Sequence, residues 1–307
     1  EYIDGHLAPH RSPRRFFSSM IAPLIEHGGT GPVVHLAPAN GFPFDTYQPL
    51  IDAVAVTHRI VSIPPRALWP QIGPPPHEPG RWDGLAVDLV EGLAAHRLDR
   101  VIGIGHSFGA VASILAALRE PSLFRGLVLL DPTLLPPWLM TRLRDGRRSG
   151  QRDWHPLAAK ARERRSEFAD RSQAFADWRG RTAFADWSDA MLWRYVDGIL
   201  RPNGRGGMTL GWSPEWEAHY YESIDTEAWD KLASLPRTIP ILLLGGSTSD
   251  AFTAECRAKF VNLVPWAETA VIEGGHLFPQ SSPETTAVAV TGWLNRLETG
   301  ALACEPH

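Results

Sequence analysis

Six short apolar runs recur along the chain, and most are separated by longer stretches with helical periodicity. The runs cover 32–37, 59–63, 100–105, 126–131, 240–245 and 269–274, and helical patterns cover 47–55, 85–96, 108–119, 252–260 and 283–298. Apolar runs of strand length that alternate with helices indicate βα units. The pattern therefore predicts an α/β fold with a mostly parallel central sheet flanked by helices. We expect residues 14–28 to add one or two antiparallel strands at the beginning.

The alternation stops between about Leu134 and Leu232. This region shows no convincing strand, is rich in arginine and holds eight of the twelve tryptophans: Trp138, Trp154, Trp178, Trp187, Trp193, Trp212, Trp216 and Trp229. We predict a helical insertion at 134–232 that divides a core made of 1–133 and 233–307. Most of its tryptophans should be packing residues, and a minority should line an apolar pocket. The proline-rich stretch 64–82 is predicted to be a long loop.

Composition limits the binding partners and the cellular compartment that we expect for this protein. A net charge of −4 gives no reason to expect nucleic acid or an anionic membrane surface, and no apolar run reaches the length of a membrane span. Cys256 and Cys304 form neither a disulfide framework nor a metal-like spacing. We therefore expect a cytoplasmic protein. The chain begins at Glu1, not Met, so a removed signal peptide is also compatible with the sequence.

The sequence GHSFG at 105–109 joins a predicted strand to a predicted helix and permits two interpretations. Gly103, Gly105 and Gly109 imitate a dinucleotide fingerprint, with Asp131 as the ribose-binding acid. The last spacing is one residue too long, however, and the bulky side chains oppose close approach of a pyrophosphate. The second interpretation is G-x-S-x-G, in which the glycines allow a sharp turn that exposes the Ser107 hydroxyl at the sheet edge. We favour this interpretation.

A nucleophilic serine needs a base and an acid that orients the base. His276 follows a strand at the same sheet edge, on a pair of glycines, and is the expected base. Asp250, in the loop after run 240–245, and Asp131, at the end of run 126–131, both fit the chain order serine, acid, histidine. We favour Asp250 and keep Asp131 as the alternative, whose simpler explanation is a polar cap where the chain leaves the sheet.

Acyl chemistry also requires donors for a developing oxyanion. One should be the backbone N–H of Phe108, directly after the nucleophile. The other should come from the loop at 35–43, where Gly41 and Pro43 shape a turn that would aim the Phe42 N–H inward.

These motifs resemble those of the α/β-hydrolase superfamily, in its serine-nucleophile branch with a helical cap. The likeness extends over most of the chain. It lies in the segments 105–109, 246–250 and 274–276, in the family's order, and in Asn40-Gly41-Phe42-Pro43, which resembles the oxyanion loop. Asn40 stands where the family usually has histidine, which should alter nearby hydrogen bonds but not the backbone donor. The resemblance also implies that 134–232 is the family's cap.

The resemblance implies acyl chemistry, because relatives that open epoxides or displace halide use an aspartate where this chain has Ser107. We expect a serine hydrolase that cleaves an ester or lactone of a small, largely hydrophobic substrate through an acyl-enzyme. Such a mechanism needs no cofactor or metal, and none is expected. His6 and His10 have the spacing of a helical metal-binding pair, but Pro9 between them spoils the helix. A carbon–carbon hydrolase, perhydrolase, acyltransferase or lyase on the same residues remains an alternative, as does a non-enzymatic ligand sensor. A small molecule is the expected partner, and a homo-oligomer is left open.

Overall fold

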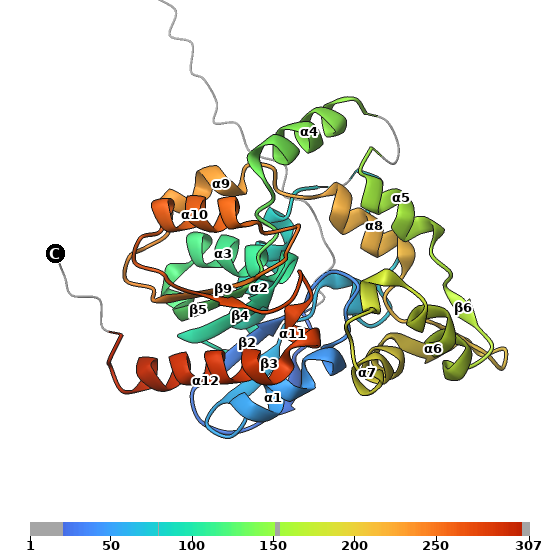
Figure 1. The fold of residues 1–307 in the computed structure, drawn as a ribbon, viewed down its shortest axis with the longest axis horizontal. Helices are drawn as coiled ribbons and strands as arrows, with labels where there is room; N and C mark the ends of the chain where they lie inside the picture. Colours follow the sequence, from blue (N-terminus) through green and yellow to red (C-terminus); the bar gives the residue numbers. More distant parts are fainter. Residues whose placement is uncertain (1–20, 79, 151–153, 303–307) are drawn as a thin grey trace, which may run out of the picture.

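A seven-stranded sheet forms the centre of the molecule (Figure 1). The computed structural model describes residues 21–78, 80–150 and 154–302. The strand order is β1-β3-β2-β4-β5-β9-β10, and every neighbouring pair is parallel except β1 with β3. The strands are β1 Ile25–Gly28, β2 Val33–Ala37, β3 Arg59–Ser62, β4 Val101–His106, β5 Phe124–Leu130, β9 Ile241–Gly246 and β10 Glu268–Ile272.

Helices cover both faces of the sheet, as the figure shows. One face packs against α1 Gln48–Val54 and α12 Pro283–Glu298, and the other packs against α2 Asp83–Ala95, α3 Phe108–Arg119 and α10 Ala254–Leu263. Alternate residues of each strand serve the two faces: in β5, Val128 and Leu130 join the first core, whereas Leu127 and Leu129 join the second. This double burial explains why the strands are continuous apolar runs.

The predicted α/β architecture is confirmed. All six predicted strands are present with ends shifted by at most two residues, and the five predicted helices lie at the expected positions. A single leading antiparallel strand, β1, lies in the described part of the expected region; residues 14–20 are outside the described residues.

The chain between β5 and β9, called the insertion below, is mostly helical, and most of it lies beside one end of the sheet (Figure 1). Its helices are α4 Pro137–Arg148, α5 Pro156–Glu163, α6 Arg171–Arg179, α7 Asp189–Ile199, α8 Pro214–Glu222 and α9 Ala228–Lys231. The expectation that this region lacks strands was wrong: β6 Glu167–Phe168, β7 Leu200–Pro202 and β8 Met208–Leu210 form a small antiparallel sheet. Strands of two or three residues are too short to produce a readable alternation.

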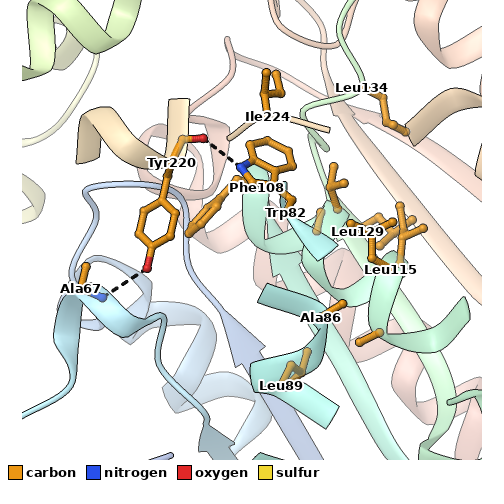
Figure 2. Close-up of a cluster of buried hydrophobic side chains, with 14 of the residues drawn as sticks. Ala67, Trp82, Ala86, Leu89, Phe108, Leu115, Leu129, Leu134, Tyr220 and Ile224 are labelled. Carbon is orange, nitrogen blue, oxygen red and sulfur yellow. Dashed lines mark hydrogen bonds between the residues drawn. The ribbon is translucent and has the colours of Figure 1, made fainter. Parts of the chain in front are cut away.

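Tyr220 of α8 joins the insertion to the core, as Figure 2 shows. Its hydroxyl accepts a hydrogen bond from the Ala67 N–H (3.2 Å), and its carbonyl accepts one from the Trp82 indole N–H (2.8 Å). Its ring also packs on Phe108, with centroids 5.2 Å apart. The described part of the proline-rich stretch is irregular apart from a 3₁₀ turn at Arg66–Leu68, and Tyr220 fixes it to the insertion at Ala67 and Trp82. No helix in the described ranges is long and apolar enough to cross a membrane.

Candidate active site

Ser107 occupies the sharp turn between β4 and α3. Its backbone has φ +58° and ψ −122°, a conformation that is strained for a residue with a side chain. A Cβ on Gly105 would lie 2.5 Å from the Gly109 carbonyl oxygen, and a Cβ on Gly109 would lie 2.5 Å from the Ala37 carbonyl oxygen. The two glycines of the G-x-S-x-G pattern are therefore required by close backbone approach, and Ser107 stands at the carboxyl edge of the sheet.

His276 approaches Ser107 from the loop after β10. Its Nε2 lies 2.9 Å from Ser107 Oγ, at hydrogen-bond distance. Gly274 has φ +126°, which lets the chain turn between β10 and α11 Phe278–Ser281 and brings the imidazole over the nucleophile. The structure thus brings together the two residues that the sequence paired.

The acid beside His276 is Asp131, and the preference for Asp250 was wrong. Asp131 Oδ2 lies 2.6 Å from His276 Nδ1, and the carboxylate is fully buried. The same carboxylate accepts hydrogen bonds from the Gly246 N–H (2.7 Å) and the Ser249 hydroxyl (2.5 Å). Asp250 is exposed and lies on the wall of the nearby cavity.

The strand order explains this correction. β5 lies between β4 and β9, so Asp131 leaves the sheet directly beside the strand that carries Ser107. The loop after β9 turns Ser249 toward Asp131, and the Phe252 N–H donates to the Ser249 hydroxyl (3.0 Å). Asp250 is left on the outer side of this turn. Asp131 directly ends an apolar run whereas Asp250 follows several polar residues, and this was the available sequence signal.

The two expected oxyanion donors differ in the structure. The Phe108 N–H, at the first residue of α3, donates to no acceptor within the described residues. The Phe42 N–H instead donates to the Ala39 carbonyl (3.1 Å) and closes a tight turn in which Gly41 has φ +78°. The prediction that this turn leaves the Phe42 N–H free to face inward was therefore wrong for this conformation. Of the two expected donors, only the Phe108 N–H is left free to bind an oxyanion.

Asn40 holds the same loop against the insertion. Its Nδ2 donates to the Glu217 carbonyl (2.9 Å), and its Oδ1 is buried with no hydrogen-bond partner in the described part of the chain. The departure from the usual histidine thus produces a hydrogen bond between the loop and α8, as well as a free acceptor. Asn40 also lines the cavity above Ser107.

A chain of hydrogen bonds that the sequence did not predict ends at the backbone of His276, the candidate base. The His276 carbonyl can only accept, so His106 Nε2 carries a proton and donates to it (2.9 Å). Nδ1 of the neutral ring then accepts from the Tyr47 hydroxyl (2.7 Å), and this hydroxyl accepts from the Ala39 N–H (2.9 Å). Burial lowers the pKa of His106 to about 3, so the ring stays neutral. The chain connects the Asn40 loop, the turn at Ser107 and the loop of His276.

Buried neutral histidines predict a loss of stability in mild acid. The pKa of six described histidines is lowered by burial, to about 4 for His35 and about 3 for His106, the others being His27, His58, His155 and His219. Below pH 6.5 the unfolded chain binds more protons than the folded chain. The stabilising effect of each neutral ring is therefore complete above pH 6.5 and is lost as the pH falls toward the folded-state pKa. For each such histidine, the free energy of unfolding falls by up to about 1.4 kcal/mol per pH unit.

Two buried carboxyl groups act in the opposite sense, because burial raises the pKa of Asp88 and Glu217. The histidines outnumber them, so the free energy of unfolding should fall steadily between pH 7.5 and 5. Urea denaturation at several pH values measures this slope. A free energy of unfolding that stays constant over this range would contradict the assignment of these rings as neutral.

A cavity of about 340 Å³ opens above Ser107. Its wall is mostly apolar and comes from both the core and the insertion: Ala39, Phe42, Trp82, Phe108, Leu135, Leu139, Leu143, Pro156, Leu157, Tyr221, Ile224 and Ala251. None of the eight tryptophans of the insertion is among these lining residues, contrary to expectation; five of them are buried as packing residues. Leucines of α4 take the role expected for tryptophan.

His155 is a polar group on the insertion side of this cavity. Its Nδ1 accepts a hydrogen bond from the Leu157 N–H (3.2 Å), which places the ring proton on Nε2. Burial lowers the pKa of His155 to about 4, so the ring is neutral at pH 7. Its face stacks on Tyr221 with centroids 5.4 Å apart. The ring can thus offer a neutral N–H donor inside an apolar wall.

The described residues contain no group of three or more histidine, cysteine, aspartate or glutamate side chains arranged to hold a metal ion. His6, His10 and Cys304 lie outside the described residues, and Cys256 is a buried free thiol.

Comparison with known proteins gives a family match over most of the chain. Residues 24–289 match the alpha/beta hydrolase family. Two curated proteins match locally: a probable alcohol acetyltransferase of Wickerhamomyces anomalus (39% identity over 59 residues, 19% of this chain and 17% of that protein) and ethanol acetyltransferase 1 of Cyberlindnera fabianii (39% over 54 residues, 18% and 16%). The matched part spans about a sixth of the length of these relatives.

Solved structures share the fold at low sequence identity. E-2-(acetamidomethylene)succinate hydrolase has a TM-score of 0.68 at 20% identity, covering 89% of this chain and 94% of that one. A thermophilic esterase from Thermogutta terrifontis has a TM-score of 0.64 at 18% identity, covering 90% and 93%. The enol-lactonase from Burkholderia xenovorans has a TM-score of 0.63 at 17% identity, covering 89% and 96%.

Proposed function

Because the chain belongs to the alpha/beta hydrolase family, we propose that it is a serine hydrolase that cleaves an ester or lactone of a small, largely hydrophobic substrate. The observation that carries this proposal is the continuous hydrogen-bonded series from Ser107 Oγ through His276 to Asp131, with distances of 2.9 Å and 2.6 Å, at the floor of an apolar cavity. Asp131 takes the place that the sequence had given to Asp250.

The geometry supports a two-step reaction. His276 Nε2 takes the proton of Ser107 as Oγ attacks the substrate carbonyl, and Asp131 holds the Nδ1 proton and stabilises the imidazolium. The Phe108 N–H, at the positive end of α3, faces the developing oxyanion. Collapse of the tetrahedral intermediate releases an alcohol, which takes the proton from His276. A water molecule then repeats the sequence on the acyl-enzyme and frees Ser107.

The cavity favours neutral groups. Among the described residues, no arginine or lysine lines the cavity. Two partly buried arginines of the insertion are paired elsewhere: Arg164 with Glu217, and Arg162 with Glu222 through bonds of 2.9 Å and 2.8 Å. A substrate carboxylate would therefore lose its hydration against an apolar wall without gaining a free cation from these pairs. The His155 N–H is a polar feature of this wall through which a neutral substrate gains orientation.

A panel of nitrophenyl esters tests this assignment. Neutral acyl groups of four to eight carbons are expected to be turned over at least about tenfold more efficiently than acyl groups that end in a carboxylate, since burial of an unpaired charge costs several kcal/mol. The measurement is kcat/KM for matched pairs of equal chain length. A preference for the charged member of each pair would contradict the substrate class.

Acyl transfer to an alcohol is a second candidate, favoured by the local matches to the two acetyltransferases. The same acyl-enzyme would serve both reactions, with an alcohol replacing water in the second step. Product analysis of the panel reactions in the presence of ethanol distinguishes them: the free acid indicates hydrolysis, and the ethyl ester indicates transfer. A ligand sensor would form neither product.

A further inference from the structure

Thr133 lies beside the nucleophile, at a position that no motif had singled out. Its Oγ1 is 2.9 Å from Ser107 Oγ. Its backbone N–H also donates to the Ser107 carbonyl (3.2 Å), which fixes the residue against the turn between β4 and α3. Thr133 follows Asp131 by two residues on the segment that leaves β5 for the insertion, and it lines the cavity. Ser107 Oγ therefore has two side-chain partners, His276 and Thr133.

The proton positions follow from the acid. The Asp131 carboxylate accepts the Nδ1 proton of His276, so Nε2 is the unprotonated nitrogen and accepts the single proton of the Ser107 hydroxyl. Ser107 Oγ has then no proton left for Thr133, and in the hydrogen bond between the two hydroxyls Thr133 must be the donor. We infer that Thr133 is a further catalytic residue, whose hydroxyl donates to the nucleophile oxygen.

This donor acts mainly in the transition state. As the Ser107 proton passes to His276, negative charge collects on Oγ, and a hydrogen bond between two neutral groups becomes a stronger, charge-assisted one. In the second step, Ser107 Oγ is the leaving group and passes through the same charge before it recovers its proton. The Thr133 hydroxyl keeps its own proton and forms no covalent bond. It should therefore accelerate both formation and breakdown of the acyl-enzyme.

The surrounding donors make this contribution more important. The Phe42 N–H is engaged by the Ala39 carbonyl, so Phe108 supplies the free backbone donor found among the described residues of this corner. Thr133 adds a side-chain donor on the nucleophile itself, at 2.9 Å. The inference rests on the proposed function, because it assumes that Ser107 attacks a carbonyl or an analogue of it.

Two variants separate the hydroxyl from the rest of the side chain. Thr133→Val keeps the shape and the backbone bond to Ser107 and removes the donor, whereas Thr133→Ser keeps the donor and removes the methyl group. The probe is a neutral alkyl phosphonate ester, whose single chemical step is attack by Ser107. Thr133→Val is expected to slow labelling by about tenfold to a hundredfold, the range for a hydrogen bond to a charged group. Thr133→Ser should label within about threefold of the unmodified chain, since the donor remains.

A binding measurement distinguishes catalysis from a structural role. The inhibition constant of a non-hydrolysable ether analogue of the best panel ester should stay the same in all three proteins, because the effect is confined to the transition state. If Thr133→Val fails to fold by circular dichroism, Thr133→Ala is expected to show the same slow labelling.

Equal labelling rates for the unmodified chain and Thr133→Val, or equally slow labelling of Thr133→Ser, would overturn the role of the hydroxyl. Both outcomes would leave the proposed function intact. Absence of labelling in the unmodified chain would overturn the acyl-enzyme together with this inference.

Discussion

Replacement of Ser107 by alanine is expected to lower ester turnover by about five to six powers of ten, because the remaining residues have no nucleophile to activate. The variant should keep its fold, since alanine removes one oxygen that lines the cavity and leaves the turn between Gly105 and Gly109 in place. The measurement is kcat for the best ester of the panel, together with phosphonate labelling followed by intact mass. Labelling should disappear.

Ser113 provides a matched control for this variant. It lies in the same helix α3, is fully buried and donates to the Gly109 carbonyl (2.9 Å), away from His276. Ser113→Ala should label normally and lose some stability through the missing hydrogen bond. Ester turnover in Ser107→Ala that matches the unmodified chain would show that another residue carries the reaction.

Asp131→Asn is expected to cost about four powers of ten in kcat, because asparagine presents the wrong partner to the imidazole. Its amide oxygen would replace Oδ1, which accepts the Gly246 N–H (2.7 Å), and its NH₂ would replace Oδ2 beside His276. An NH₂ donor there favours the tautomer whose proton lies on Nε2. That nitrogen can then no longer accept the proton of Ser107.

Asp250→Asn is the matched control, since Asp250 is exposed on the cavity wall and the imidazole forms its hydrogen bonds with Asp131 and Ser107 instead. Its kcat should change by less than about threefold, as expected for a surface substitution. Circular dichroism and thermal melting show whether each variant remains folded. A large loss of kcat in Asp250→Asn with little loss in Asp131→Asn would identify Asp250 as the acid that orients His276. Equal moderate losses would contradict a single orienting carboxylate.

The strands of the core were predictable because they are buried on both faces. Such strands are continuous apolar runs, and glycine, proline and polar residues mark their ends. The short strands β6, β7 and β8 of the insertion were not predictable, because two or three residues give no alternation that differs from a loop. The tryptophans were misleading for a related reason: an aromatic residue in a helical segment indicates burial but not which cavity it faces.

Ser107 and His276 were predictable because local chemistry identifies them: a serine between two glycines after a strand, and a histidine on a glycine pair after another strand. The choice between Asp131 and Asp250 depended on the strand order, which places β5 beside β4, and on the turn that directs Ser249 inward. The Phe42 N–H failed as an inward donor because Gly41 also permits a closed turn on Ala39. Thr133 carries no sequence signal, since its role depends on a single contact across the turn.

The most direct test of the account is the mass of the acyl-enzyme itself. The protein is mixed with its best nitrophenyl ester, quenched in acid within the first turnover and digested, and the acylated peptide is sequenced by mass spectrometry. The account predicts one added acyl group, on Ser107, that accumulates with the burst of nitrophenol and disappears as the substrate is consumed. Nitrophenol release with no acyl group on any residue, or with the acyl group on another side chain, would contradict a reaction that proceeds through Ser107.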